Sequence, residues 1–184
     1  MSNRRLRIAI LGYSRAGKDT AGIWLGEHTP LRYAGSASEI VCPLIAADLG
    51  ISEEEAWKNR HIDRQFWFTW CNEFRRGDPT RLARVALEKG DICVGLRDQD
   101  EVAACVDLGL FDLTVWISST RVPADPTVTF TSSDCDVSID NSGSVAQFHK
   151  KLNKFCHFAS IPVYEEKESC LLSLKTETIP TFSI

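Results

Sequence analysis

The stretch that most limits how this chain can fold is a strand-like run that ends in a glycine-bounded loop. Residues 6–11 are largely apolar, the run breaks at Gly12, and a helix-like sequence begins at Gly17 and Lys18. In a loop of the form G-x-x-x-x-G-K, the glycines let successive backbone N–H groups point inward at phosphate oxygens, and the helix that follows adds its positive end. The pattern therefore predicts a strand, a phosphate-binding loop and a helix, in that order.

We expect a nucleotide, with ATP as the donor, to contact the consecutive residues of this loop and helix start: Gly12, Tyr13, Ser14, Arg15, Ala16, Gly17, Lys18, Asp19 and Thr20. Lys18 is a candidate catalytic residue, because its mobile charge can reach the β- and γ-phosphates. A Ser or Thr usually follows this lysine and binds Mg²⁺ through its hydroxyl. Here the position is taken by Asp19, with Thr20 next. Asp19 is therefore our candidate Mg²⁺-binding residue, while the mode of ligation stays open.

The composition fits one globular domain of a reducing compartment. The chain has 184 residues, of which 43% are hydrophobic and 25% charged, and a formal net charge of −4. Its seven cysteines include no C-x-x-C pair, so we expect free cytoplasmic thiols rather than a disulfide framework or a zinc site. No apolar run reaches membrane-spanning length, and we expect no secretory leader. The negative charge gives no global attraction to nucleic acid, although a local basic groove remains compatible with it.

Strand-like and helix-like segments alternate along the chain. We expect strands at 6–11, 30–34, 92–96, 113–117 and 137–139, with a further short strand at 127–130. We expect helices from Gly17, over 39–49, from Ser52 to about Arg76, over 79–89, over 100–108, and after Ser144. Such alternation is typical of an α/β protein whose parallel sheet has helices on both faces. We predict a three-layer fold of the P-loop NTPase type with a five-stranded parallel sheet, and leave residues 157–184 as an appended strand or tail.

The segment from Trp57 to Arg84 is locally basic and aromatic in an otherwise acidic chain. At helical spacing, one stripe holds aromatic residues that we expect to pack into the core: Phe66, Trp70 and Phe74. The neighbouring stripe combines cations with a tryptophan and a cysteine: Arg60, Arg64, Trp67, Cys71 and Arg75. Arginines beside a tryptophan can bind phosphates next to a stacked base. Arg60, Arg64 and Trp67 are therefore candidate substrate-binding residues, the alternative being a solvated basic face.

Charged residues also follow the third and fourth expected strands. Arg97 and Asp98 come directly after the third strand, so a parallel sheet places them on the side of the phosphate-binding loop. Arg97 is a candidate substrate-binding residue for an acceptor or transferred phosphate, and Asp98 a candidate catalytic residue that binds Mg²⁺ through water or accepts a proton. Arg121, in the loop after the fourth strand, is a candidate catalytic cation for the phosphoryl group in transfer. A salt-bridged turn and an exposed loop arginine are the structural alternatives.

Two resemblances point to a family. The run Gly17-Lys18-Asp19-Thr20 resembles the loop of phage deoxynucleoside-monophosphate kinases. Further stretches are similar to phage kinases that phosphorylate 5-hydroxymethyluracil within DNA, a step in thymine hypermodification: Tyr33-Ala34-Gly35-Ser36, Glu55-Ala56-Trp57 with Arg60-His61, Arg64-x-Phe66-Trp67, and Val94-Gly95-Leu96-Arg97-Asp98.

These resemblances imply a single P-loop kinase domain over residues 1–184. The acceptor would bind a helical insertion at about 36–89, and a lid-like loop would lie at about 118–135. They also imply ATP and Mg²⁺ as cofactors, a pyrimidine nucleotide within DNA as the acceptor, and the cytoplasm of an infected bacterial host as the location.

Three functions stay open on the sequence. A kinase acting on 5-hydroxymethyluracil in DNA transfers to a neutral alcohol, for which a positioned carboxylate such as Asp98 or Asp19 helps. A deoxynucleoside-monophosphate kinase transfers to an anionic phosphate and needs arginines but no general base. A nucleotide-dependent switch or ATPase is the third, and it is disfavoured because the chain lacks a strand that ends in the expected acidic run.

Overall fold

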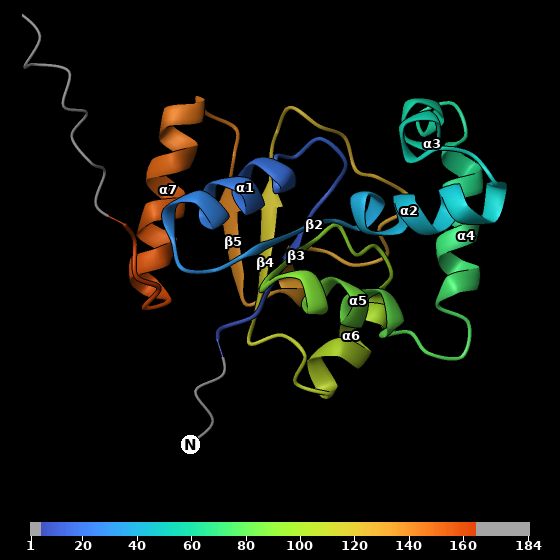
Figure 1. The fold of residues 1–184 in the computed structure, drawn as a ribbon. Coiled ribbons are helices and arrows are strands. Elements are labelled where there is room, and N and C mark those ends of the chain that lie inside the picture. The colour runs from blue at the N-terminus through green and yellow to red at the C-terminus, as the bar shows by residue number, and fades with distance from the viewer. Residues whose placement is uncertain (1–4, 165–184) are drawn as a thin grey trace, which may run out of the picture.

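A computed structural model describes residues 5–164 of the chain, and its centre is a five-stranded, all-parallel sheet in the order β2-β3-β1-β4-β5 (Figure 1). The strands are β1 (Ile8–Leu11), β2 (Tyr33–Ser36), β3 (Ile92–Val94), β4 (Leu113–Ser118) and β5 (Val137–Asp140). The predicted α/β class with a five-stranded parallel sheet is confirmed. The arrangement is consistent with a three-layer fold of the P-loop type.

Helices cover both faces of this sheet. On one face lie α1 (Lys18–His28) and α7 (Val145–Phe158). On the other lie α2 (Ala37–Leu49), α5 (Arg81–Lys89) and α6 (Gln99–Asp107), while α3 (Glu53–Asn59) and α4 (Arg64–Phe74) pack on α2 at the outer end of the molecule (Figure 1). Because side chains alternate along a strand, Ile8 and Ile10 of β1 join the core under α1 and α7, and Ala9 and Leu11 join the opposite core.

The position of β1 determines where a ligand can bind. β1 pairs with β3 on one side and with β4 on the other, both in parallel register. The connections on its two sides therefore lead in opposite directions along the sheet. Ligands of open α/β sheets bind outside the carboxyl ends of the strands at such a point. The loop that follows β1 is the one with the glycine-lysine pattern.

The single long helix predicted from Ser52 to Arg76 is wrong. The chain leaves the helix after Asn59, turns through residues 60–63, and begins α4 at Arg64. The amides of Ile62 and Asp63 both donate to the carbonyl of Asn59 in this turn. No glycine or proline marks the break, so packing against α2 overrides the local helical preference.

The side of α4 that faces the core differs from the predicted one. Trp67 is 6% exposed and belongs to the core, whereas Phe66 is 41% exposed. Trp70 and Phe74 are partly buried and pack against the same core, as predicted. The predicted stripes are therefore wrong for Phe66 and Trp67, because the core side of α4 runs along Trp67, Trp70, Cys71 and Phe74.

Other differences are local. No strand forms at 127–130, and β2 begins at Tyr33 rather than at residue 30. The six described cysteines are free. The tail predicted over 157–184 lies outside the described residues from position 165 onward. In the part of the chain that the structure describes, no helix is long and apolar enough to cross a membrane.

Candidate active site

The loop between β1 and α1 has a backbone that ordinary residues adopt rarely. Gly12 has a φ of 138° and Gly17 a φ of 103°, and Arg15 between them also has a positive φ of 63°. A Cβ atom on Gly12 would lie 2.4 Å from the carbonyl oxygen of Ile117 in β4. Glycine is therefore required at position 12 both by its backbone conformation and by the neighbouring strand.

Lys18 opens α1, and its ammonium folds back over the loop, donating to the carbonyl of Tyr13 at 2.7 Å. Burial, with a contribution from Arg97, lowers the pKa of Lys18 to about 8. Among residues 5–164 no carboxylate lies within ion-pair distance of this ammonium. A confined cation beside the positive end of a helix is an anion-binding arrangement.

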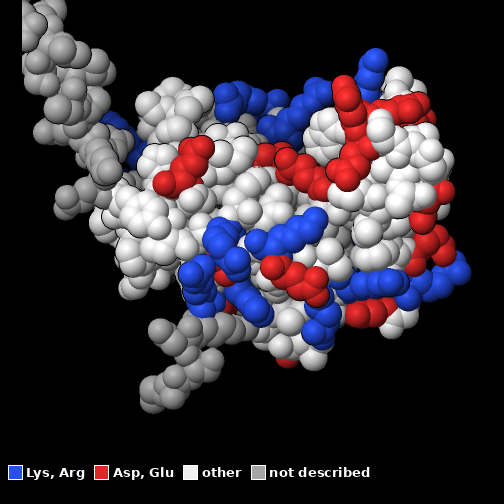
Figure 2. All heavy atoms as spheres, in the orientation of Figure 1, with Lys and Arg blue, Asp and Glu red and all other residues white. Residues whose placement is uncertain are grey.

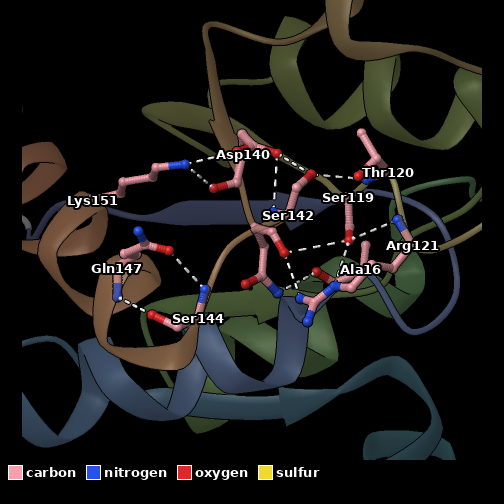
Figure 3. Close-up of polar contacts among 10 residues, drawn as sticks. Ala16, Ser119, Thr120, Arg121, Asp140, Ser142, Ser144, Gln147 and Lys151 are labelled. Atoms are coloured by element: carbon pink, nitrogen blue, oxygen red, sulfur yellow. Dashed lines mark hydrogen bonds and ion pairs between the residues drawn. The ribbon is translucent and has the colours of Figure 1, made fainter.

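The turn after β5 is joined to this loop by direct contacts (Figure 3). The side-chain amide of Asn141 donates to the carbonyl of Ala16 at 2.8 Å, and a Cβ on Gly17 would lie 2.3 Å from the same amide nitrogen. Ser144 caps α7 in a reciprocal pair with Gln147. The contacts hold the start of α7 against the back of the glycine loop.

Arg121 belongs to this end of the site. Its guanidinium donates to the carbonyl of Asn141 and to the hydroxyl of Ser119 (Figure 3). These contacts place it beside the β5–α7 turn rather than beside Asp125 and its arginines, described next. The predicted role of Arg121 at the transferring phosphoryl group stays a prediction.

On the other side of the loop, two arginines converge on a carboxylate that the sequence analysis did not single out. Asp125 accepts from Arg97 at 2.9 Å and lies 3.5 Å from the guanidinium of Arg64. Thr127 donates to its other oxygen from both hydroxyl and amide. Burial alone would raise the pKa of Asp125, but the hydrogen bonds from Thr127 and Arg97 outweigh it and hold the pKa at about 2. Asp125 is therefore ionised throughout the physiological range.

Asp125 also fixes the loop that was predicted to be lid-like. The amide of Thr129 donates to the carbonyl of Arg97, and the amide of Gln99 donates to the hydroxyl of Thr129. The loop after β4 is thereby joined to the loop after β3. A polar Asp-Pro-Thr run was the available signal, because Asp followed two residues later by Thr favours a side-chain turn.

The two sides of the site are electrostatically connected. Arg97 and Arg64 lower the pKa of Lys18, and Asp125 raises it. Arg60 acts on the pKa of Asp19. The structure thus brings together the predicted residues Lys18, Asp19, Arg60, Arg64 and Arg97, while their roles stay predictions.

Two predicted residues lie elsewhere or are already engaged. Trp67 is buried, so it has almost no surface on which a base could stack. Asp98 is the N-cap of α6, where one carboxylate oxygen accepts from the amides of Asp100 and Glu101. Asp98 therefore fits the structural alternative of a turn that opens a helix. In the described part of the chain, no contact between Asp98 and the loop at Lys18 supports a catalytic role.

Asp19 lies in the first turn of α1 beside Lys18. Desolvation raises its pKa, with Lys18 and Arg60 opposing and Glu39 adding to the effect. No group of three His, Cys, Asp or Glu side chains within residues 5–164 is arranged to hold a metal. A Mg²⁺ ion at Asp19 would therefore take most of its ligands from nucleotide oxygens and water, which is common for this ion.

A buried ion pair joins α4 to α6 beneath the group formed by Arg64, Arg97 and Asp125. Glu101 is 2% exposed, accepts from Arg75 at the end of α4, and leaves its Oε1 without a hydrogen-bond partner among the described residues. Burial raises the pKa of Glu101 to about 7, although Arg75 opposes the effect. The pair joins α4 to α6 and so holds the outer helices against the sheet.

The raised pKa of Glu101 predicts a stability that falls with pH. The stabilising proton is bound fully below about pH 4.5 and is lost as the pH rises through about 7. We expect Glu101→Gln to flatten the fall in the free energy of unfolding between about pH 5 and 8, measured by urea denaturation. Glu88→Gln, at an exposed position of α5, is the control. An unchanged pH slope in Glu101→Gln would contradict the assignment.

Chemically, the site combines a phosphate-binding loop with a mixed group of cations and carboxylates at the carboxyl ends of the strands. Such an arrangement can hold a nucleoside triphosphate on one side and a molecule that accepts a phosphoryl group on the other. No protein-family model matches the chain, and no curated protein matches it either.

Proposed function

We propose that this protein is an ATP-dependent phosphotransferase. The loop at Gly12–Gly17, the ammonium of Lys18 and the start of α1 supply the groups that bind the phosphates of ATP. When bound, ATP supplies the phosphoryl group and the oxygens that hold Mg²⁺. Arg64 and Arg97 both lower the pKa of Lys18, and in this proposal they would bind the acceptor or the transferring phosphoryl group.

We further infer that the acceptor is a neutral alcohol, namely the hydroxymethyl group of 5-hydroxymethyluracil in DNA. The observation that carries this inference is the ionised carboxylate of Asp125 between Arg64 and Arg97. A free monophosphate would bring two negative charges toward cations that Asp125 already neutralises in part. The reacting hydroxyl of an alcohol carries no charge, so the remaining positive charge suits the transferring phosphoryl group and the phosphates that flank the acceptor in DNA.

A neutral alcohol also needs somewhere to put its proton. The hydroxyl oxygen forms the new bond to phosphorus, the bond between phosphorus and ADP breaks, and the hydroxyl proton passes to a nearby base. Asp125 is a poor base because its pKa is held at about 2, which leaves Asp19, beside Lys18 in the first turn of α1, as the candidate; in this role it would contact Mg²⁺ only through water.

The test is to supply ATP labelled at the γ-phosphate together with three acceptors. These are a DNA oligonucleotide containing 5-hydroxymethyluracil, the same oligonucleotide with thymine, and free deoxynucleoside monophosphates including the hydroxymethyl form. We expect label only in the first. Label in the free monophosphates would instead support a deoxynucleoside-monophosphate kinase, and release of inorganic phosphate without any labelled acceptor would support an ATPase.

The monophosphate kinase is the second candidate because basic and acidic side chains are mixed on the face shown in Figure 2. Basic side chains lie along the upper edge and in the lower middle of this face, with acidic ones between them. The formal net charge is −4. The resemblance of Gly17–Thr20 to monophosphate kinases favours the same candidate.

Asp125→Asn should separate the two kinase functions. Loss of the carboxylate removes the ion partner that Arg64 and Arg97 share. We therefore expect the KM for a free monophosphate to fall by about tenfold, or inorganic phosphate to inhibit at about tenfold lower concentration. Turnover with hydroxymethyluracil DNA should fall, because the arginines lose their fixed position. Steady-state kinetics with both acceptors measure this, and Asp107→Asn, exposed on α6, controls for the change in net charge. Equal effects on both acceptors would contradict the role given to Asp125.

A further inference from the structure

The end of α3 presents an exposed tryptophan that is held from two directions. Trp57 is 40% exposed. The guanidinium carbon of Arg60 lies over its ring, 4.2 Å from the centroid. The buried Trp67 meets the ring edge-on, with centroids 6.5 Å apart. Trp57 is therefore a supported ring with an open part, and not a side chain that lies loose on the surface.

The surroundings of Trp57 combine apolar surface with positive charge. Ile62 is 72% and Phe66 is 41% exposed, and both follow Trp57 across the turn between α3 and α4. Over residues 57–64 the chain has Lys58, Arg60 and Arg64 against a single carboxylate, Asp63. An aromatic and arginine surface with an excess of positive charge is complementary to an unstacked base and its phosphates.

This surface is continuous with the candidate active site. Arg60, which covers Trp57, acts on the pKa of Asp19 beside Lys18. Arg64, at the start of α4, contacts Asp125 and acts on the pKa of Lys18. A DNA strand that passes Asp125 and Arg64 would therefore lead from the candidate active site toward the turn that follows α3.

We propose that Trp57 and Arg60 form a stacking site for a base that neighbours the acceptor nucleotide in a DNA strand. Trp57 supplies the exposed part of its ring, Arg60 holds that ring from one side, and Arg64 supplies positive charge for a flanking phosphate. The proposal rests on the proposed function in taking DNA as the acceptor. It assigns recognition to Trp57, in place of the Trp67 that the sequence pattern favoured.

The test compares Trp57→Ala, Trp57→Phe and Phe158→Ala by fluorescence anisotropy of a labelled single-stranded oligonucleotide. Phe158 is an exposed aromatic residue, 75% exposed at the end of α7, and is the matched control. We expect Trp57→Ala to weaken binding by about tenfold or more, Trp57→Phe to retain most of the affinity, and Phe158→Ala to have no effect. Affinity of the parent should fall steeply with salt, and KM for ATP should be unchanged throughout.

The outcomes separate this proposal from the proposed function. Parent-like binding by Trp57→Ala, or no oligonucleotide binding by the parent, overturns the stacking site. Weaker binding of a free monophosphate by Trp57→Ala with no effect on the oligonucleotide also overturns it, because the ring would then hold the acceptor's own base. If hydroxymethyluracil DNA is never phosphorylated but Trp57→Ala still loses oligonucleotide binding, the proposed function fails and the stacking site stands. A large loss of thermal stability in both Trp57 variants would make the residue structural and overturn it too.

Discussion

Replacing Lys18 with alanine should abolish phosphoryl transfer while leaving the protein folded. The ammonium lies over the glycine loop, bonded to the carbonyl of Tyr13, and no carboxylate among residues 5–164 pairs with it. Its strongest partner would be a phosphate oxygen in the transition state. Removal of one such electrostatic group typically reduces turnover by about 10²- to 10³-fold.

The measurement is kcat with γ-labelled ATP and whichever acceptor is labelled, together with the melting temperature. Confinement lowers the pKa of Lys18 to about 8, so its charge is a cost to the empty protein and the melting temperature of Lys18→Ala should not fall. Lys154→Ala, exposed on α7, should retain normal turnover. A Lys18→Ala variant with near-normal turnover would refute phosphoryl transfer at this loop.

Gly12→Ala should have an effect of similar size, for a steric reason. Its added Cβ would lie 2.4 Å from the carbonyl oxygen of Ile117, a backbone atom that a side-chain rotation cannot move. The loop or β4 must shift, and the amides that face phosphate shift with it. We expect nucleotide binding to be lost, which calorimetry with ATP or a non-hydrolysable analogue measures.

Gly77→Ala is the matched control for this substitution. Gly77 also has a positive φ, 82°, but a Cβ there would meet no atom within 4 Å. The control therefore has the backbone strain without the collision. We expect this strain to cost about 1 kcal/mol of stability and to leave ATP binding intact. If both variants bind ATP equally well, the contact between Gly12 and β4 does not shape the site.

Much of the donor side could be predicted because its residues are neighbours in sequence. The run from residue 6 to Thr20 contains the strand, the loop and the start of the helix, so spacing alone indicates the geometry. The alternation of strands and helices likewise predicts the parallel sheet. The hydrogen bond from Asn141 to Ala16, across 125 positions of the chain, is a contact that sequence spacing cannot predict.

The acceptor side was harder to predict because its residues meet only through the fold. The break between Asn59 and Arg64 has no glycine or proline to indicate it, and the core side of α4 follows Trp67, Trp70 and Phe74 rather than the stripe through Phe66. Asp125 reaches Arg64 across 61 positions of the chain. A helical periodicity shows which residues share one side of a helix. It does not show which side packs inward, or which distant loop supplies a partner.

The two halves of the site differ in whether backbone atoms or side chains form them. The half that we propose binds ATP is built mainly from main-chain atoms held by β1, β4 and the Asn141 turn, so we expect few neutral substitutions there. The half that we propose binds the acceptor consists of side chains that come from separate segments, namely Trp57, Arg60, Arg64, Arg97 and Asp125. None of these side chains belongs to β1 or to the loop that follows it. Under the proposed function, the architecture would therefore let the acceptor diverge, in nature or by design, while ATP stays the source of the phosphoryl group.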